Sequence, residues 1–453
     1  MFCYRSCEQC RLVSKHGIPL MAHGFSKENQ SSIDTAYRFG DFELYPRDRL
    51  LKQAGVAVPL QPKAFDALLC MVCRAGHLVS KQELIHTLWP SVHVSEANLT
   101  NTIVSLRKIV GRDSIRTVSK HGYRFEQPVA GEPGVARKTY ERFIRAKELT
   151  AQRSLESMYL ARDLYWTCLA EDPGFAPAWA WLGRCCWFLV KFTDNSSANL
   201  ELAQAAFQRA FALDPDLASA HQFYTLVQVD TGHADEAMRR LLERIARHPS
   251  EPESYASLVQ VYRFRGLLQQ SVEAHRRATE LDPAIITGVA HTLFLAGDYA
   301  SAIETYSGRG AYYLDAAAWT ALGDKKRAMA LLRERLGKMS LSKLMTALMS
   351  SLLAVLEDRA NEAARLMEAT DTTREPEILV YFARHYAQLG LTDLAVSALK
   401  RASQSGFVCA PSTLRSDTWL GAVRKHPEFG NLLSAAEALV EEARSGFEAY
   451  TTS

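Results

Sequence analysis

A 34-residue spacing constrains the fold of this chain more than any other feature of its sequence. Successive prolines stand 34 residues apart in the pairs Asp214-Pro215, His248-Pro249 and Asp282-Pro283. Gly232 and Gly266 keep the same spacing, and so do the small residues Ala237 and Ser271. Self-similarity at this period is typical of units made of two helices and a turn, which bury their apolar faces only by stacking on neighbours. The sequence therefore predicts a superhelical array of helix pairs.

The array extends on both sides of these units. The unit that opens at Pro252 is the most complete, with Tyr255, Leu258, Tyr262, Gly266, Ser271, Ala278 and Pro283 at the repeat positions. An earlier unit opens at Trp179 and carries a polar insertion near residues 192–198. Later units at Gly297, Gly323 and Gly390 keep only the turn and a small residue. We expect six to eight helix pairs within residues 137–453.

A different pattern precedes the array. Residues 37–60 alternate apolar and polar side chains in short runs, which predicts a small antiparallel sheet. Two helical patterns follow it. One begins at Pro62, and the other follows the capping sequence Ser80–Glu83 and stops at Trp89-Pro90.

A third predicted helix, capped by Ser95, has one apolar and one polar face. The apolar face carries Leu99, Ile103, Leu106 and Val110. The other face carries Asn98, Asn101, Ser105, Lys108 and Arg112. An exposed stripe that is entirely polar and ends in basic residues fits the major groove of DNA.

Two β-prone runs, residues 115–119 and 123–125, follow the third helix. The intervening Lys120-His121-Gly122 predicts a hairpin turn in which Gly122 takes the position that needs a positive φ. The formal net charge of the whole chain is only +3, yet residues 100–124 hold six basic side chains against the single acidic Asp113. This local excess suits binding to a polyanion.

These elements resemble the OmpR/PhoB-type winged-helix family. The resemblance rests on four segments in order: Lys63–Leu69, Glu83–Trp89, Ile103–Lys108 and Gly122–Phe125. The repeats resemble the tetratricopeptide (TPR) superfamily, in the arrangement of HilA-like regulators. The resemblance implies an α+β winged helix-turn-helix domain followed by an all-α TPR-like superhelical solenoid. It further implies a sequence-specific DNA-binding transcription regulator, with a recognition helix at about residues 95–110 in the major groove and a wing at residues 115–125 on the backbone or minor groove.

The family alignment, the polar stripe and the wing together define the candidate DNA contacts. They are Asn98, Thr100, Asn101, Thr102, Ser105, Arg107, Lys108, Arg116, Thr117, Lys120 and His121. Relatives often carry arginine where Val104 and Ser105 stand here, so their base preference does not transfer. Asparagine pairs with adenine in the major groove, and we therefore expect A·T pairs opposite Asn101 and Asn98. The loop Pro90–Val94 matches the segment through which such proteins touch RNA polymerase.

We expect four segments. They are a flexible tail (residues 1–33), the winged helix (34–128), a linker (129–136) and the repeat domain (137–453). The repeats carry no excess of positive charge, so their concave groove predicts a protein or peptide partner rather than DNA. Double-stranded DNA, RNA polymerase and a second copy of the chain on DNA complete the expected partners. The alternative is a TPR scaffold whose winged helix serves protein docking; an enzyme regulated through the repeats is a third hypothesis.

No catalytic pattern supports that third hypothesis. The chain lacks a Walker A or Rossmann glycine pattern, a His-Glu-x-x-His motif and a Gly-x-Ser-x-Gly motif, so we predict no enzymatic activity and no cofactor. Cys3, Cys7 and Cys10 have the spacing of a cluster-binding trio, but an unstructured tail explains them better. Cys70 and Cys73 fit core packing better than half of a zinc site.

The sequence also lacks a membrane-spanning pattern. The most apolar run, Leu344–Leu356, is shorter than a span requires and predicts a buried repeat helix. The N-terminus lacks the apolar core of a signal peptide. We therefore expect a cytoplasmic protein without a membrane partner.

Overall fold

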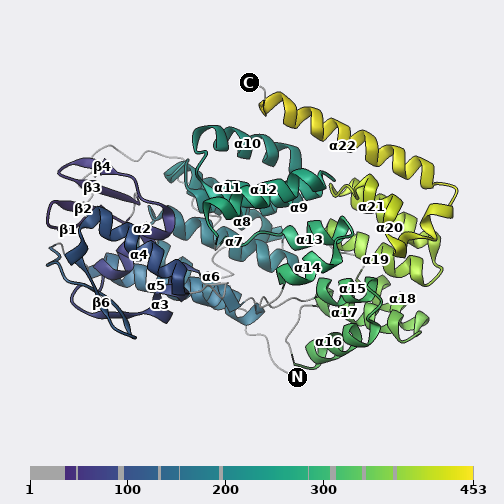
Figure 1. Ribbon diagram of the computed structural model, residues 1–453, viewed down its shortest axis with the longest axis horizontal. Helices are drawn as coiled ribbons and strands as arrows, with labels where there is room; N and C mark the ends of the chain where they lie inside the picture. Colours follow the sequence, from purple (N-terminus) through teal and green to yellow (C-terminus); the bar gives the residue numbers. More distant parts are fainter. Residues whose placement is uncertain are drawn as a thin grey trace.

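The computed structural model describes residues 36–46, 49–89, 96–130, 134–152, 154–192, 197–283, 285–306, 313–338, 343–370 and 375–451. It confirms the predicted order of a small α+β unit followed by a helical solenoid. Figure 1 shows the strands and first helices (purple) at one end of the molecule, and the repeat helices (blue-green to yellow) filling the rest.

Residues 37–58 form the predicted antiparallel sheet. Its strands pair in the order β1 (Tyr37–Phe39), β2 (Phe42–Tyr45), β3 (Leu50–Gln53) and β4 (Val56–Val58). Leu44 lies opposite Leu51 in the β2–β3 register, and both side chains are buried. Because alternate side chains of a strand point to the same face, these leucines give the sheet one apolar face.

Three helices share one core with this sheet: α2 (Pro62–Val72), α3 (Lys81–Leu88) and α4 (Glu96–Val110). The expected cap of α3 is present, since the Ser80 hydroxyl accepts a hydrogen bond from the Glu83 amide at 3.1 Å. The Glu83 carboxylate forms an ion pair with Arg74. The predicted cap of α4, Ser95, lies outside the described residues.

A second sheet contains the predicted hairpin and one strand that the sequence did not predict. β7 (Gly122–Phe125) pairs with β6 (Ile115–Val118) and also with β5 (Leu78–Ser80); the short 3-10 helix η1 (Arg112–Ser114) precedes β6. The prediction of a positive φ at Gly122 is wrong, because the positive φ of this turn, 64°, belongs to Lys120. Gly122 is required for close packing instead: a Cβ there would lie 2.0 Å from the Val79 carbonyl oxygen on β5.

The described residues after the winged helix form eight consecutive helix pairs, within the predicted six to eight. In order they are α5 (Gly134–Gln152) and α6 (Leu155–Glu171); α7 (Ala176–Phe192) and α8 (Ser197–Leu213); α9 (Ala218–Asp230) and α10 (Ala234–Arg247); α11 (Pro252–Phe264) and α12 (Leu268–Leu281); α13 (Val289–Leu295) and α14 (Tyr299–Tyr306); α15 (Leu314–Ala321) and α16 (Lys325–Lys338); α17 (Lys343–Leu356) and α18 (Ala360–Glu368); α19 (Pro376–Gln388) and α20 (Thr392–Gln404). α21 (Pro411–Ser416), the 3-10 helices η2 (Thr418–Leu420) and η3 (Val423–Lys425), and α22 (Phe429–Thr451) complete the chain. Most of the apolar run Leu344–Leu356 is buried in α17, as expected.

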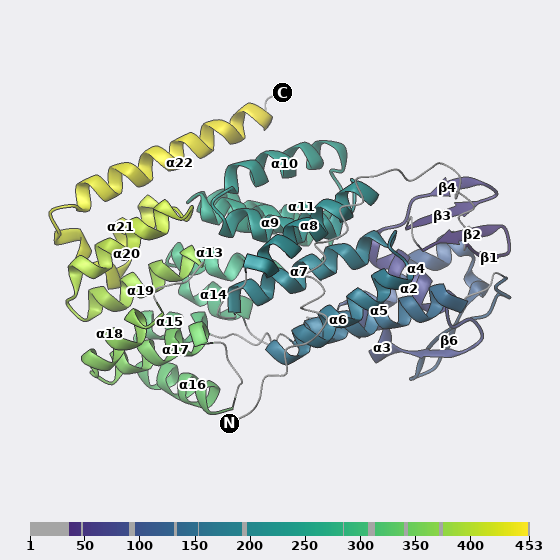
Figure 2. The same ribbon diagram turned by 180° about the vertical axis from the view of Figure 1, so that it is seen from behind.

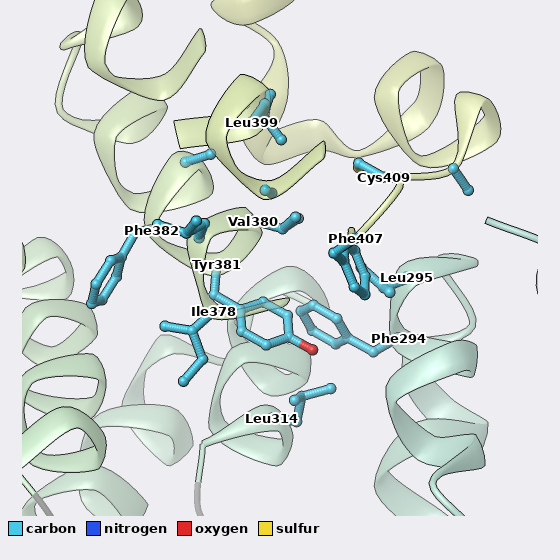
Figure 3. Close-up of a cluster of buried hydrophobic side chains, with 14 of the residues drawn as sticks. Phe294, Leu295, Leu314, Ile378, Val380, Tyr381, Phe382, Leu399, Phe407 and Cys409 are labelled. Carbon is cyan, nitrogen blue, oxygen red and sulfur yellow. The ribbon is translucent and has the colours of Figure 1, made fainter. Parts of the chain in front are cut away.

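The array curls back on itself around α19. Polar side chains from earlier repeats reach α19 or the residue before it in these pairs: Lys191–Glu375 (2.6 Å), Arg263–Glu377 (3.2 Å), His291–Glu377 (3.1 Å), Tyr313–His385 (2.7 Å) and Ser351–His385 (2.9 Å). Every residue from Pro376 to Ala387 is buried. Figure 3 shows the Tyr381 ring directed at Phe294 within this apolar cluster. The inner face of α11–α17, where we expected an open groove, is therefore occupied by the chain's own α19.

The C-terminal segment closes this arrangement. The Val408 amide donates a hydrogen bond to the Phe264 carbonyl oxygen at 2.8 Å, and the Phe407 ring packs edge-on against Phe264. α22 runs back along the outside of the array, where Phe447 meets Tyr262 of α11 (Figure 2). The repeats thus form a closed body rather than an open-ended stack.

The winged helix and the first repeats have a common core. One hydrophobic cluster runs from Tyr37 to Val227, and a second runs from Val229 to Ala443. The division between the two cores therefore lies within α9. Arg38 and Ala130 exchange two backbone hydrogen bonds of 2.8 Å, which tie the chain after the wing to β1.

Candidate nucleic-acid interface

The sequence stripe on α4 forms a continuous exposed surface. Leu99, Ile103, Leu106 and Val110 are buried against the core and fix the rotation of the helix. Consequently Thr100, Asn101, Ser105 and Lys108 are exposed, and Asn98 and Thr102 are half-buried at the edge of the stripe. Val104 is 43% exposed in the middle of it. Exposed amide, hydroxyl and ammonium groups therefore lie together on one face of α4, where a single ligand could contact them all.

Two hydroxyl groups of this face form hydrogen bonds within α4, and an ion pair lies at the start of the helix. The Thr100 hydroxyl donates to the Glu96 carbonyl oxygen at 2.9 Å, and the Thr102 hydroxyl donates to the Asn98 carbonyl oxygen at 3.0 Å. Lys81 at the start of α3 forms a 2.5 Å ion pair with the Glu96 carboxylate at the start of α4. This pair ties the first turns of the two helices together. It could not be predicted from local sequence patterns, because Lys81 and Glu96 lie 15 residues apart.

The wing places basic side chains beside α4. Arg116 is exposed on β6 and has only a loose ionic contact, 4.0 Å, with Glu126. Lys120 is exposed at the turn, and the exposed His121 ring nitrogen Nδ1 lies 2.8 Å from the Ser119 carbonyl oxygen. The candidate residues of α4 and of the wing therefore belong to adjoining exposed surfaces of one domain.

Arg107 differs from the other candidates because its guanidinium bonds to the wing. Nε and Nη2 both donate to the Ile115 carbonyl oxygen, at 3.0 and 2.6 Å, and Nη2 also donates to the Thr117 hydroxyl at 2.8 Å. The guanidinium lies 6.0 Å from the centre of the Tyr123 ring. Arg107 thus joins α4 to both strands of the wing.

We expect Arg107→Ala to destabilise the wing by about 1–3 kcal/mol, because it removes charge-assisted hydrogen bonds to Ile115 and Thr117. Hydrogen exchange at the β6 and β7 amides measures this loss locally. Lys108→Ala is the matched control, since the neighbouring Lys108 is exposed and its loss should change stability by less than about 0.5 kcal/mol. Equal protection of the wing in the two variants would show that Arg107 does not support it.

Cys70 of α2 and Cys73, the residue after this helix, are not arranged as a ligand site. Cys70 and Cys73 are buried, and the Cys73 thiol donates to the Tyr37 hydroxyl at 3.2 Å. Burial raises the pKa of Cys70 to about 12, so this sulfur stays a neutral thiol. In the part of the chain that the structure describes, no group of histidine, cysteine and carboxylate side chains could hold a metal ion. Cys3, Cys7 and Cys10 lie outside the described residues.

Residues 55–125 match the family described as "Transcriptional regulatory protein, C terminal". The matched segment contains all three helices, η1 and the complete second sheet described above. The N-terminal domain is an OmpR/PhoB-type winged helix. α4 and the β6–β7 hairpin both lie within this matched segment.

Known relatives match this winged helix over a limited length. The transcriptional regulator HilA of Salmonella typhimurium is 36% identical over 95 residues, which is 20% of this chain and 17% of HilA. The transcriptional activator CadC of Escherichia coli is 31% identical over 98 residues, 20% of this chain and 19% of CadC. The solved DNA-binding domain of E. coli CadC is 27% identical and aligns with 22% of this chain and 97% of that domain, with a TM-score of 0.20. The chain therefore spans less than a fifth of the length of these curated relatives.

Among the described residues, no helix is long and apolar enough to cross a membrane.

Proposed function

We propose that this protein is a sequence-specific DNA-binding transcription regulator. α4 would lie in the major groove, and the β6–β7 wing would contact the backbone or the minor groove. The observation that carries the proposal is the exposed polar face of α4 beside a basic wing, on a winged helix whose relatives are transcriptional regulators.

Base recognition in this proposal falls to the asparagines. Asn101 is exposed and Asn98 lies at the edge of the same face. An asparagine amide can donate to adenine N7 and accept from adenine N6, a pairing that distinguishes A·T in the major groove. We therefore assign A·T preference to Asn101, with Asn98 as its neighbour.

Affinity that does not depend on sequence would come from phosphate contacts. Lys108, Arg116 and Lys120 are exposed cations on the two adjoining surfaces. Each cation that neutralises a phosphate releases a condensed counterion, so it contributes to the salt dependence of binding. Arg107 and Thr117 enter the proposal differently, because their hydrogen bond sets the position of the wing relative to α4.

Asn101→Ala should weaken binding to the preferred sequence by about 1–3 kcal/mol and leave binding to random DNA nearly unchanged. Lys108→Ala should weaken binding to both DNAs alike and flatten the plot of log affinity against log salt by roughly one unit. Titration of the full chain against both DNAs at several salt concentrations measures these effects. Asn361→Ala, at an exposed position of α18, is the matched asparagine control and should bind both DNAs as the parent chain does.

Equal losses on specific and random DNA in Asn101→Ala would overturn the assignment of this asparagine to a base. Failure of the parent chain to protect any discrete sequence in a footprint would favour the alternative, a TPR scaffold whose winged helix docks proteins.

The repeat array would bind a protein partner or effector. Stacked helix pairs commonly present extended surfaces to proteins, and residues 131–453 carry 36 basic against 39 acidic side chains, which does not favour DNA. Because α19 fills the inner face of α11–α17, we place the partner on another surface of the array. RNA polymerase and a second copy of the chain on DNA remain part of the proposal; the loop Pro90–Val94, expected to contact the polymerase, lies outside the described residues.

A further inference from the structure

α5, the first repeat helix, packs against the winged helix. Tyr140 and Phe143 of α5 lie in the same hydrophobic cluster as α2 and α3, and both are buried. Burial raises the pKa of Tyr140, and nearby Asp66 of α2 adds to the effect. We call the contact of α5 with α2 and α3 the seam.

A lysine is buried within the seam. Lys147 of α5 is 8% exposed. Its ammonium lies 3.4 Å from the Thr87 carbonyl oxygen of α3, at the outer limit of a hydrogen bond. It also faces the rings of Trp181 and Phe143, at 5.4 and 5.8 Å from their centres. These contacts replace the hydration of an ammonium poorly.

The charges around Lys147 do not compensate for its burial. Asp66 of α2 is the attractive charge, but its carboxylate forms a 2.7 Å ion pair with Arg49. The remaining charges that act on Lys147 are the cations Lys63 of α2, Arg49 before β3 and Arg184 of α7, which repel it. A buried charge without a close opposite partner destabilises the contact that buries it.

We propose that the seam is a releasable latch between the winged helix and the repeat array, and that the buried ammonium of Lys147 holds this latch close to opening. Opening would expose Lys147 to water while the sheet and the helices of the winged helix stay packed on one another. α4 packs on α2 and α3, so an opened latch would let it change its orientation relative to the array together with them.

The latch should depend on pH in a definite direction. Burial lowers the pKa of Lys147 to about 8, and attraction by Asp66 only partly opposes this. A lysine exposed by opening has a pKa of about 10.4. The closed state thus binds the proton more weakly than the open state. The free-energy cost of burying the Lys147 ammonium in the closed state is complete below a pH of about 8 and disappears as the pH rises past about 10.4. The closed state therefore becomes more stable between these two values.

The test compares the full chain with Lys147→Met, which keeps the length of the side chain without the charge. At pH 7, α3 and α5 amides should exchange with solvent at least about tenfold more slowly in the variant, and on the order of a hundredfold if the full shift applies. Comparing the two proteins at one pH cancels the intrinsic pH dependence of exchange. At pH 10 the ratio of their rates should fall toward one.

Lys138→Met is the matched control, because Lys138 lies on α5 and is exposed. In this variant the amides of α3 and α5 should exchange at the same rates as in the parent chain. Amides of α19 and α20, far from the seam, should be unaffected in both variants. The latch is refuted if Lys147→Met does not slow the seam amides at pH 7, if the ratio is the same at pH 10, or if α19 and α20 slow equally, since the last result means global unfolding. No DNA is present, so the outcome is independent of the proposed function.

Discussion

Asp417→Ala is expected to lower the free energy of unfolding of the full chain by about 3–5 kcal/mol, because it leaves the Arg384 guanidinium buried without its counter-ion. Arg384 is 1% exposed in its side chain, and its Nε donates to the Asp417 carboxylate at 2.7 Å. The guanidinium also lies 4.6 Å from the centre of the Phe294 ring and 5.2 Å from that of Trp419. Urea denaturation measures the loss.

Two comparisons test the cause of this loss. Glu273→Ala breaks an ion pair with Arg276 in which both side chains are more than half exposed, and it should change the stability much less than Asp417→Ala does, because water screens the exposed pair. Replacing both partners, with Arg384→Met and Asp417→Leu together, should cost less than Asp417→Ala alone, since no buried charge remains. A double variant less stable than Asp417→Ala would show that packing, and not the unpaired charge, dominates.

Trp89→Ala is expected to destabilise the winged helix by about 3–5 kcal/mol, because a large side chain leaves the core. Trp89 ends α3, where the sequence pattern predicted the helix to stop, and it is 5% exposed. Loss of protection at the amides of α2, α3 and α4 in hydrogen exchange measures the effect. Trp89→Phe keeps an aromatic ring in the core and should cost much less; an unchanged stability in Trp89→Ala would contradict a structural role.

Local patterns predicted the elements of the winged helix well. The apolar spacing of Leu99, Ile103, Leu106 and Val110 correctly identified the buried face of α4, because burial of one helix face requires that period. The strand β5 was missed because it has only the residues Leu78–Ser80, too few to show an alternation. Its pairing with β7 also explains Gly122, whose close approach to Val79 depends on a strand over 40 residues earlier in the chain.

Long-range arrangement could not be predicted from the repeats. Their period correctly indicated stacked helix pairs, but it contains no information on how tightly the stack curves. Only the structure shows that α19 lies against α11, α13 and α17. Lys147 was missed for a similar reason: lysine is common on exposed helix faces, and its burial results from the winged helix that packs over it. The candidate DNA contacts on α4 follow from a local stripe, but the hydrogen bonds of Arg107 to β6 depend on how the hairpin folds beside α4, which no local pattern indicates.

The closure around α19 has a consequence for how the chain acquires its structure during synthesis. In an ordinary solenoid each repeat touches only its neighbours, so repeats can order one after another as they leave the ribosome. Here Arg263 bonds to Glu377 across 114 residues, and Thr413 bonds to the Leu295 carbonyl oxygen across 118 residues. Contacts of such separation form late, because a long loop must close first. The inner faces of the middle repeats therefore remain exposed until the last quarter of the chain has been translated. A chaperone would be needed most during that interval.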